Sequence, residues 1–118
     1  MEVSNVVKTK VVYIAGPYSH PTREGVQANI DAAEAVGKSM LHKGYAPLLP
    51  HRISAFWDED PQFAHMKHGD WMHKVCIPLL DKCDAVVMVP GWRDSPGSVM
   101  EHQHASNRGI PIFYHGEQ

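Results

Sequence analysis

The sequence predicts an α/β fold: a single doubly wound domain with a parallel sheet of about four to five strands. Two short apolar runs rich in β-branched residues predict buried strands, at Val11–Ala15 and Ala85–Val89. Each run ends abruptly at a Gly/Pro pair, Gly16-Pro17 after the first and Pro90-Gly91 after the second. Helical patterns alternate with the strands, and this alternation is typical of a parallel sheet of the flavodoxin or Rossmann type.

The first helix is expected after a loop over residues 16–25. From Val26 to Leu41 the apolar residues recur with a period near 3.6, and Lys43-Gly44 provides the stop. Tyr45–Pro50 is expected to be the second strand. Its prolines cannot donate hydrogen bonds to a neighbouring strand, so they favour an edge position.

The segment His51–Gly69 has no clear period and is rich in aromatic residues and histidine. A long irregular segment in a small domain is usually a lid or a binding loop. A helix is expected over Asp70–Lys82, bent or delayed by Pro78. A last helix from about Gly97 to Arg108 and a last strand over Ile110–Tyr114 complete the alternation.

Composition limits the class of partner. At 118 residues and 43% apolar composition, the chain suits one domain over residues 11–118, preceded by a leader over residues 1–10. A formal net charge of −2 provides no basic face for a nucleic acid polymer. No apolar run approaches the roughly 18 to 20 residues of a membrane helix. Two cysteines without a secretion signal predict reduced thiols and a cytoplasmic protein.

The loop between Pro90 and the last helix has the pattern of a ligand site. In an open parallel sheet, ligands bind beyond the carboxyl ends of the strands. Ser95 is placed as the N-cap of the helix, and Glu101 follows roughly one turn further in. The free N–H groups of a helix start suit an anion, and their partial positive charge is expected to keep Glu101 ionised. The alternative is an ordinary capped α/β unit without a site.

Several short motifs occur in a specific order along the chain. They are Tyr13–Pro17, Lys43–Tyr45, Leu79-Leu80 with Asp84–Val87, Pro90–Trp92, Ser95–Gly97 with Glu101 and Ala105, and Gly109–Ile112. In this order and spacing the chain, from Val11 onward, resembles the nucleoside 2-deoxyribosyltransferase-like superfamily, including its small uncharacterised members. The resemblance implies cleavage or exchange of the N-glycosidic bond of a nucleoside or nucleoside 5′-monophosphate, with no metal or other cofactor.

The resemblance also implies roles for individual residues. Glu101 matches the family nucleophile, a carboxylate that can trap an oxocarbenium-like sugar as a glycosyl-enzyme. Tyr13 matches the tyrosine that positions this carboxylate, and a half-buried strand aromatic is the alternative. The substrate is expected to contact Gly16, Ser19, Asp94, Ser95, Gly97 and Ser98. Trp57 and Trp92 are expected to stack on the base, and core or dimer packing is the alternative for both.

Two positions bear on whether the substrate carries a phosphate. Six places before the nucleophile, the branch of the family that acts on 5′-monophosphates carries serine, as this chain does at Ser95. The branch that acts on free nucleosides carries aspartate there, so Ser95 favours a nucleotide unless it is only a helix cap. Asp94 could then take over the hydroxyl-binding role. In the first loop, Pro17 and Ser19 replace the phosphate-binding serine and arginine of the family, with Arg23 further along.

Cys76 departs from the family pattern. Active members carry an acid at this position, which contacts the base or helps to protonate it. A thiol is a poor general acid for a nucleobase, so Asp70, Asp81 or a lid histidine would have to supply the proton. The alternatives are a non-catalytic nucleotide-binding module and a purely structural subunit.

The nine histidines raise the question of a metal site. His65, His68 and His73 lie at short spacings from Cys76, but only half of a zinc ligand set is visible, so solvated side chains or a nucleotide pocket are the favoured interpretation. Sites in the family are commonly completed by a neighbouring subunit. With the aromatic residues of the 51–69 segment, this predicts a homodimer or a higher homo-oligomer.

Overall fold

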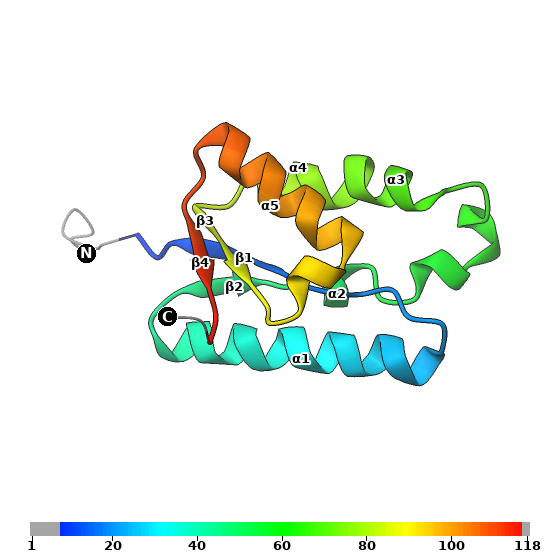
Figure 1. The fold of residues 1–118 in the computed structure, drawn as a ribbon, viewed down its shortest axis with the longest axis horizontal. Coiled ribbons are helices and arrows are strands. Elements are labelled where there is room, and N and C mark those ends of the chain that lie inside the picture. Colours follow the sequence, from blue (N-terminus) through cyan, green and yellow to red (C-terminus); the bar gives the residue numbers. More distant parts are fainter. Residues whose placement is uncertain (1–7, 117–118) are drawn as a thin grey trace, which may run out of the picture.

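In the computed structural model, which describes residues 8–116, four parallel strands form one sheet in the order β2-β1-β3-β4 (Figure 1). The strands are β1 (Val11–Ala15), β2 (Ala46–Leu48), β3 (Ala85–Met88) and β4 (Ile112–Tyr114). This confirms the predicted doubly wound α/β fold and the edge position of β2. Most of the expected leader, residues 1–7, lies outside the described residues, and residues 8–10 are in no helix or strand.

The strand order reverses between β1 and β3. From β1 the chain crosses through α1 (Arg23–His42) to β2 at one edge, and it later returns to place β3 on the other side of β1. Ala15 at the end of β1 pairs with Met88 at the end of β3, so the loops after the two strands begin side by side. Ligands bind at such switch points in open α/β sheets.

Helices cover both faces of the sheet. Figure 1 shows α1 on one face and α4 (Ile77–Leu80) with α5 (Pro96–Arg108) on the other. Residues of β1 alternate between the two layers: Val12 and Ile14 belong to the core under α1, and Tyr13 and Ala15 to the core under α4 and α5. Tyr13 is therefore buried on the face where α5 lies.

The helix expected over residues 70–82 consists of three parts. They are α3 (His68–Trp71), a π-helical turn over Met72–Cys76 (η3), and α4. Pro78 has no N–H group for the carbonyl of Lys74, which is its partner in a regular α-helix. The chain forms a wider turn instead, in which the N–H group of Ile77 donates to the carbonyl of Met72. The sequence predicts a bend or a late start at Pro78, but the helical segment already begins at His68, and Pro78 is accommodated by the π turn before it.

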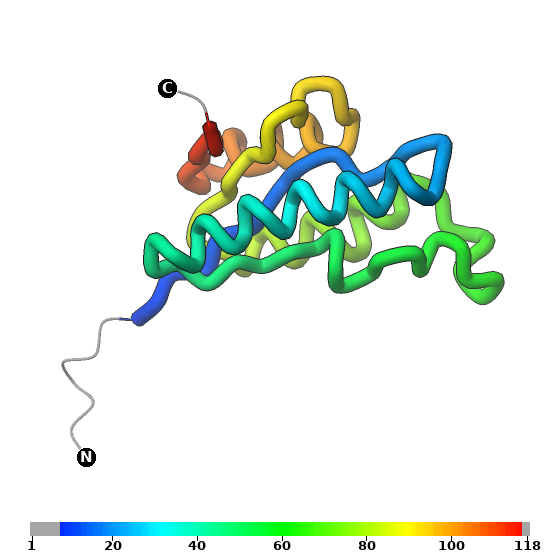
Figure 2. The backbone as a smooth tube through the Cα atoms, turned by 90° about the horizontal axis from the view of Figure 1, so that it is seen from below, coloured from blue at the N-terminus to red at the C-terminus, as the bar shows by residue number. Residues whose placement is uncertain are grey.

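The 51–69 segment contains short helical turns. They are α2 (Pro50–Ile53), η1 (Trp57–Glu59) and η2 (Pro61–Phe63). Figures 1 and 2 both place the part after α2 at the same end of the molecule as the start of α1. Within residues 8–116, no helix combines the length and the apolarity that crossing a membrane would require.

Candidate active site

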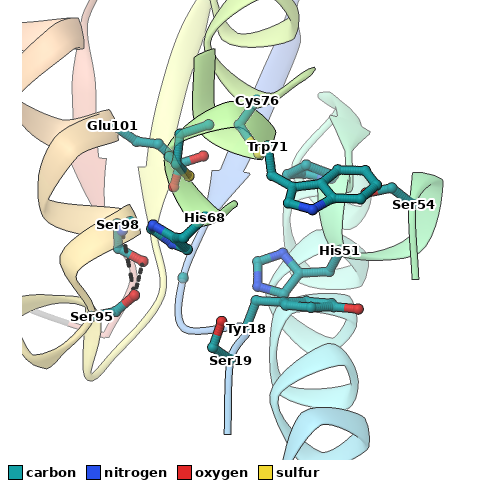
Figure 3. A pocket seen from close by; sticks show the side chains of 14 residues that line it. Tyr18, Ser19, His51, Ser54, His68, Trp71, Cys76, Ser95, Ser98 and Glu101 are labelled. Carbon is teal, nitrogen blue, oxygen red and sulfur yellow. Dashed lines mark hydrogen bonds between the residues drawn. The ribbon is translucent and has the colours of Figure 1, made fainter. Parts of the chain in front are cut away.

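A pocket with a cavity volume of about 100 Å³ opens at the carboxyl ends of β1 and β3. Its walls come from the loop after β1, from α2, from α3 with the π turn, and from the start of α5 (Figure 3). Six of the predicted site residues line it: Gly16, Ser19, Ser95, Gly97, Ser98 and Glu101. The structure therefore brings together the two loops that the sequence marked separately.

Glu101 lies in the second turn of α5, is only 5% exposed and lines the pocket. The hydroxyl of Tyr13, which is fully buried, donates a hydrogen bond to Oε2 of Glu101. Burial raises the pKa of Glu101 to about 8, and the hydrogen bond from Tyr13 opposes this rise. The expectation that the helix start keeps Glu101 ionised is therefore wrong. A helix dipole acts mainly within the first turn, and Glu101 lies beyond it.

Cys76 lies beside Glu101 at the same end of the pocket (Figure 3). Burial, and then the negative charge of Glu101, raise the pKa of the Cys76 thiol to about 11. Burial and the same carboxylate raise the pKa of Tyr13 well above its ordinary value. Both groups therefore keep their protons at neutral pH. Tyr13 acts as a hydrogen-bond donor to Glu101, and Cys76 is neither a thiolate nor an effective proton donor.

The start of α5 forms the wall next to Glu101. Ser95 is the N-cap, as predicted, and its Oγ accepts hydrogen bonds from the N–H group of Ser98 at 3.3 Å and from the Ser98 hydroxyl at 3.1 Å. A Cβ atom on Gly97 would lie only 3.2 Å from Nε2 of His68 and 3.3 Å from Sδ of Met72. The absence of a side chain at Gly97 thus allows α3 and the π turn to close against α5.

The opposite wall is aromatic. Tyr18, His51 and Trp71 lie there, across the pocket from Glu101 (Figure 3). The rings of Tyr18 and His51 meet edge to face with centroids 5.6 Å apart. Nε2 of His51 lies 2.8 Å from the carbonyl oxygen of Pro17, and burial lowers the pKa of His51, so the ring is neutral and donates from Nε2.

The segment after α2 is tied to the loop after β1 and to the start of α1. The N–H group of Phe56 donates to the Tyr18 hydroxyl at 2.8 Å, and Phe56 has a left-handed backbone with φ of 63°. Arg23 forms an ion pair with Glu59 and lies over the Phe56 ring, 3.8 Å from its centroid. A second hollow of about 240 Å³, lined in part by this segment, shares Tyr18, Ser19, Ser54, His68 and Trp71 with the pocket.

Four predicted site residues do not line the pocket. One is Tyr13, whose hydroxyl is hydrogen-bonded to Glu101, and the other three are Trp92, Trp57 and Asp94. Trp92 is buried in the core beside α5, where it stacks on His102 with ring centroids 4.4 Å apart. Trp57 is 46% exposed and stacks on Phe63. Asp94 is exposed at the end of η4 (Trp92–Asp94). Core packing, the alternative reading, therefore describes Trp92, and neither tryptophan reaches a base in this pocket.

The residues that could donate a proton to the base differ in whether they line the pocket. Asp70 accepts from the N–H group of Lys67 at 2.9 Å, and Asp81 contacts His104 at 2.7 Å, and neither lines the pocket. Of the histidines in the 51–69 segment, His51 and His68 line the pocket. In the part of the chain that the structure describes, no group of three or more His, Cys, Asp or Glu side chains could hold a metal ion.

Sequence reasoning missed the residues of the aromatic wall, Tyr18, His51 and Trp71, as well as Ser54 and Met72. His51 directly follows Pro50 at the carboxyl end of β2, so the rule used for β1 and β3 could have found it. Trp71 and Met72 had no such signal, because the side of the helix that faces the pocket depends on the π turn.

The parallel sheet with a pocket at its switch point defines an α/β protein of the doubly wound type, with a candidate ligand site where such folds usually carry one. The chain belongs to the family described as Domain of unknown function (DUF7768), whose model matches residues 10–115. A search of curated proteins found no match. The family match includes every residue that lines the pocket, and its description assigns no activity.

Proposed function

We propose that this protein cleaves or exchanges the N-glycosidic bond of a nucleoside or nucleoside 5′-monophosphate, with Glu101 as the nucleophile. The observation that carries the proposal is a buried carboxylate in the pocket at the switch point, one of whose oxygens is held by Tyr13. Departure of a base leaves positive charge on the sugar carbon, and a positioned carboxylate stabilises that charge or traps it.

The reaction has two steps. In the first, a carboxylate oxygen of Glu101 bonds to the anomeric carbon while the carbon–nitrogen bond breaks, and the electron pair of that bond leaves with the base. In the second, water or another base attacks the same carbon, loses a proton and releases the Glu101 carboxylate. Tyr13 keeps its hydrogen bond to Glu101 and so fixes the direction of attack.

The departing base needs a proton, for which His68 is the proposed donor. It lies next to Gly97 on the wall between Glu101 and the aromatic residues (Figure 3). Cys76 holds its proton too tightly for this step, and His51 is neutral with Nε2 directed at Pro17. His68 is exposed, so solvent can reach the imidazole that the proposal uses as the proton donor.

The raised pKa of Glu101 is consistent with this chemistry. Burial makes the ionised carboxylate unfavourable, so its charge is poorly stabilised before the reaction. The positive charge that develops on the sugar would stabilise the same carboxylate. The site would therefore favour the transition state over the resting state.

A second candidate is a nucleotide-binding module without turnover. Cys76 favours this candidate. Active members of the superfamily that the chain resembles carry an acid at this position, and the high pKa of the thiol means that Cys76 cannot replace that acid as a proton donor. Both the wild-type protein and Glu101→Gln would then bind a nucleoside or nucleotide, and neither would release the base.

The test is to incubate the protein with a panel of nucleosides and 5′-monophosphates and to measure free base by chromatography. Glu101→Ala and Glu101→Gln should abolish release, whereas Glu24→Gln, an exposed carboxylate on α1, should leave it unchanged. Saturable binding without release by the wild-type protein would select the binding module. Neither binding nor release, at high protein concentration, would contradict both candidates.

A further inference from the structure

We propose that the pocket selects an uncharged nucleoside over the corresponding 5′-monophosphate. This inference rests on the proposed function and names its class of substrate. Three observations support it: the side chains that line the two connected hollows, the contacts of Arg23, and the hydrogen bonds already made at the start of α5.

Among the described residues, neither the pocket nor the hollow that continues from it is lined by lysine or arginine. Proteins usually bind the doubly charged phosphate group with such side chains. The two histidines of the pocket do not replace them: His51 is neutral and directs Nε2 at Pro17, and His68 is the residue assigned to the base. The second hollow even adds a carboxylate, Asp58.

Arg23, which the sequence places in the first loop and which is the first residue of α1, is directed elsewhere. Its guanidinium pairs with Glu59 and lies over the ring of Phe56, and it lines neither hollow. To reach a phosphate, Arg23 would have to give up both contacts. The segment that carries Phe56 and Glu59 is itself held in place by the left-handed backbone at Phe56 and by the hydrogen bond from Phe56 to Tyr18.

The start of α5 has few donors left for an anion. Pro96, the first residue of the helix, has no N–H group. The N–H group of Ser98 donates to Ser95 Oγ, and that of Val99 donates to the carbonyl of Ser95 at 2.9 Å. Gly97 therefore provides the first backbone N–H that is left for a ligand. One N–H group beside a capping serine suits a sugar hydroxyl better than a phosphate dianion.

The rest of the pocket suits a neutral nucleoside. Tyr18 and Trp71 provide aromatic surface for a planar base, and the hydroxyls of Ser19 and Ser54 can bond to the sugar. A phosphate dianion close to Glu101 would also oppose ionisation of the carboxylate, which the attack requires.

The experiment measures binding to Glu101→Gln protein, which cannot turn over, by calorimetry at about 0.1 M salt. Each of the common nucleosides is compared with its own 5′-monophosphate. We expect the best-bound nucleoside to bind at least tenfold more tightly than its monophosphate. Adding Ser19→Arg, which places a cation in the pocket, should raise monophosphate affinity and reduce this ratio. Ser106→Arg, exposed near the far end of α5, is the matched control and should leave the ratio unchanged.

The outcomes separate this inference from the proposed function. Equal or tighter binding of the monophosphate would overturn the selectivity and leave the proposed function standing. No binding of either compound would count against both. Failure of Ser19→Arg to raise monophosphate affinity would also count against the inference, and Ser54→Arg, at a second position that lines the pocket, repeats the test if Ser19→Arg does not fold.

Discussion

Two side chains lie beside Glu101, and the proposed reaction gives them different roles. Tyr13 holds a carboxylate oxygen from the fully buried face of β1, and Cys76 provides bulk without charge. His68 lies on the neighbouring wall and is exposed to solvent. Roles at the residue scale can therefore be tested one group at a time.

His68→Gln should lower kcat by about 10²- to 10⁴-fold on ordinary nucleosides, because general acid catalysis contributes that much. A glycoside with a nitrophenolate leaving group needs no proton, so its kcat should fall by less than about tenfold. Kinetics on the two substrates provide the comparison. His65→Gln, an exposed histidine that does not line the pocket, is the control. An equal loss on both substrates would rule out the acid role.

Cys76 and Cys83 should both react slowly with iodoacetamide at pH 8, at least about 100-fold more slowly than in urea, because burial raises each thiol pKa to about 11. In Glu101→Gln, Cys76 loses a neighbouring negative charge and should react faster. Cys83, which has Asp84 beside it, should not change and so provides an internal control. Mass spectrometry of the labelled peptides measures both rates, and parallel changes at the two cysteines would contradict this account.

At the scale of elements, the position of the first loop depends on how closely β1 approaches the end of β3. A Cβ atom on Gly16 would lie 2.6 Å from Cβ of Val89, closer than side chains can pack. The backbone after β1 therefore passes directly over the end of β3, and this contact brings Ser19 and Tyr18 to the pocket. No side chain can be added at Gly16 without moving one strand end.

Gly16→Ala should lower the free energy of unfolding by about 1 to 3 kcal/mol, the usual effect of overpacking, and should weaken nucleoside binding as the loop shifts. Gly69→Ala is the matched control, since no atom lies within 4 Å of a Cβ there and the residue is within α3. That substitution should be neutral or stabilising by up to about 1 kcal/mol. Urea denaturation of both variants gives the comparison, and equal stabilities would contradict the close approach.

The sequence was sufficient for elements with strong local signals. The β-branched runs, their Gly/Pro stops and the Ser95 cap predicted β1, β3, the start of α5 and the place of Glu101. It was insufficient where tertiary packing decides. Trp92 comes just after a buried strand, where a side chain could stack on a bound base. It packs in the core instead, because α5 and β4 cover it. The ionisation of Glu101 likewise depended on burial, which no local pattern reports.

At the scale of the whole molecule, Glu101 links stability to pH. The folded state, with a pKa of about 8, keeps the Glu101 proton at pH values where the unfolded chain, near 4.5, has released it. Stability due to this group is therefore complete below about pH 4.5 and falls as the pH rises toward 8. The direction is opposite to that of a carboxylate in an ion pair.

The free energy of unfolding of Glu101→Gln, minus that of the wild type, should thus increase by about 3 kcal/mol between pH 4 and pH 7. The wild type loses stability over this range and the variant does not lose it at this position. Denaturant titrations at several pH values measure the difference, from which other titrating groups cancel. Glu24→Gln should show no such trend. A difference that stays constant across the range would mean that Glu101 is ionised in the folded protein.

The predicted homodimer or higher homo-oligomer stays a prediction, to be checked by measuring the mass of the protein in solution.

The π turn over Met72–Cys76 contains one residue more than regular α-helical spacing needs. Loss of a single codon, such as that of the exposed Lys74, would remove the surplus and rotate the chain before it by about 100° against α4. Trp71 and His68 would then turn away from the cavity, while the sheet and its two cores kept their sequence. A lineage with this architecture could gain or lose its chemistry by such an insertion or deletion, with every side chain of the site still present in the gene.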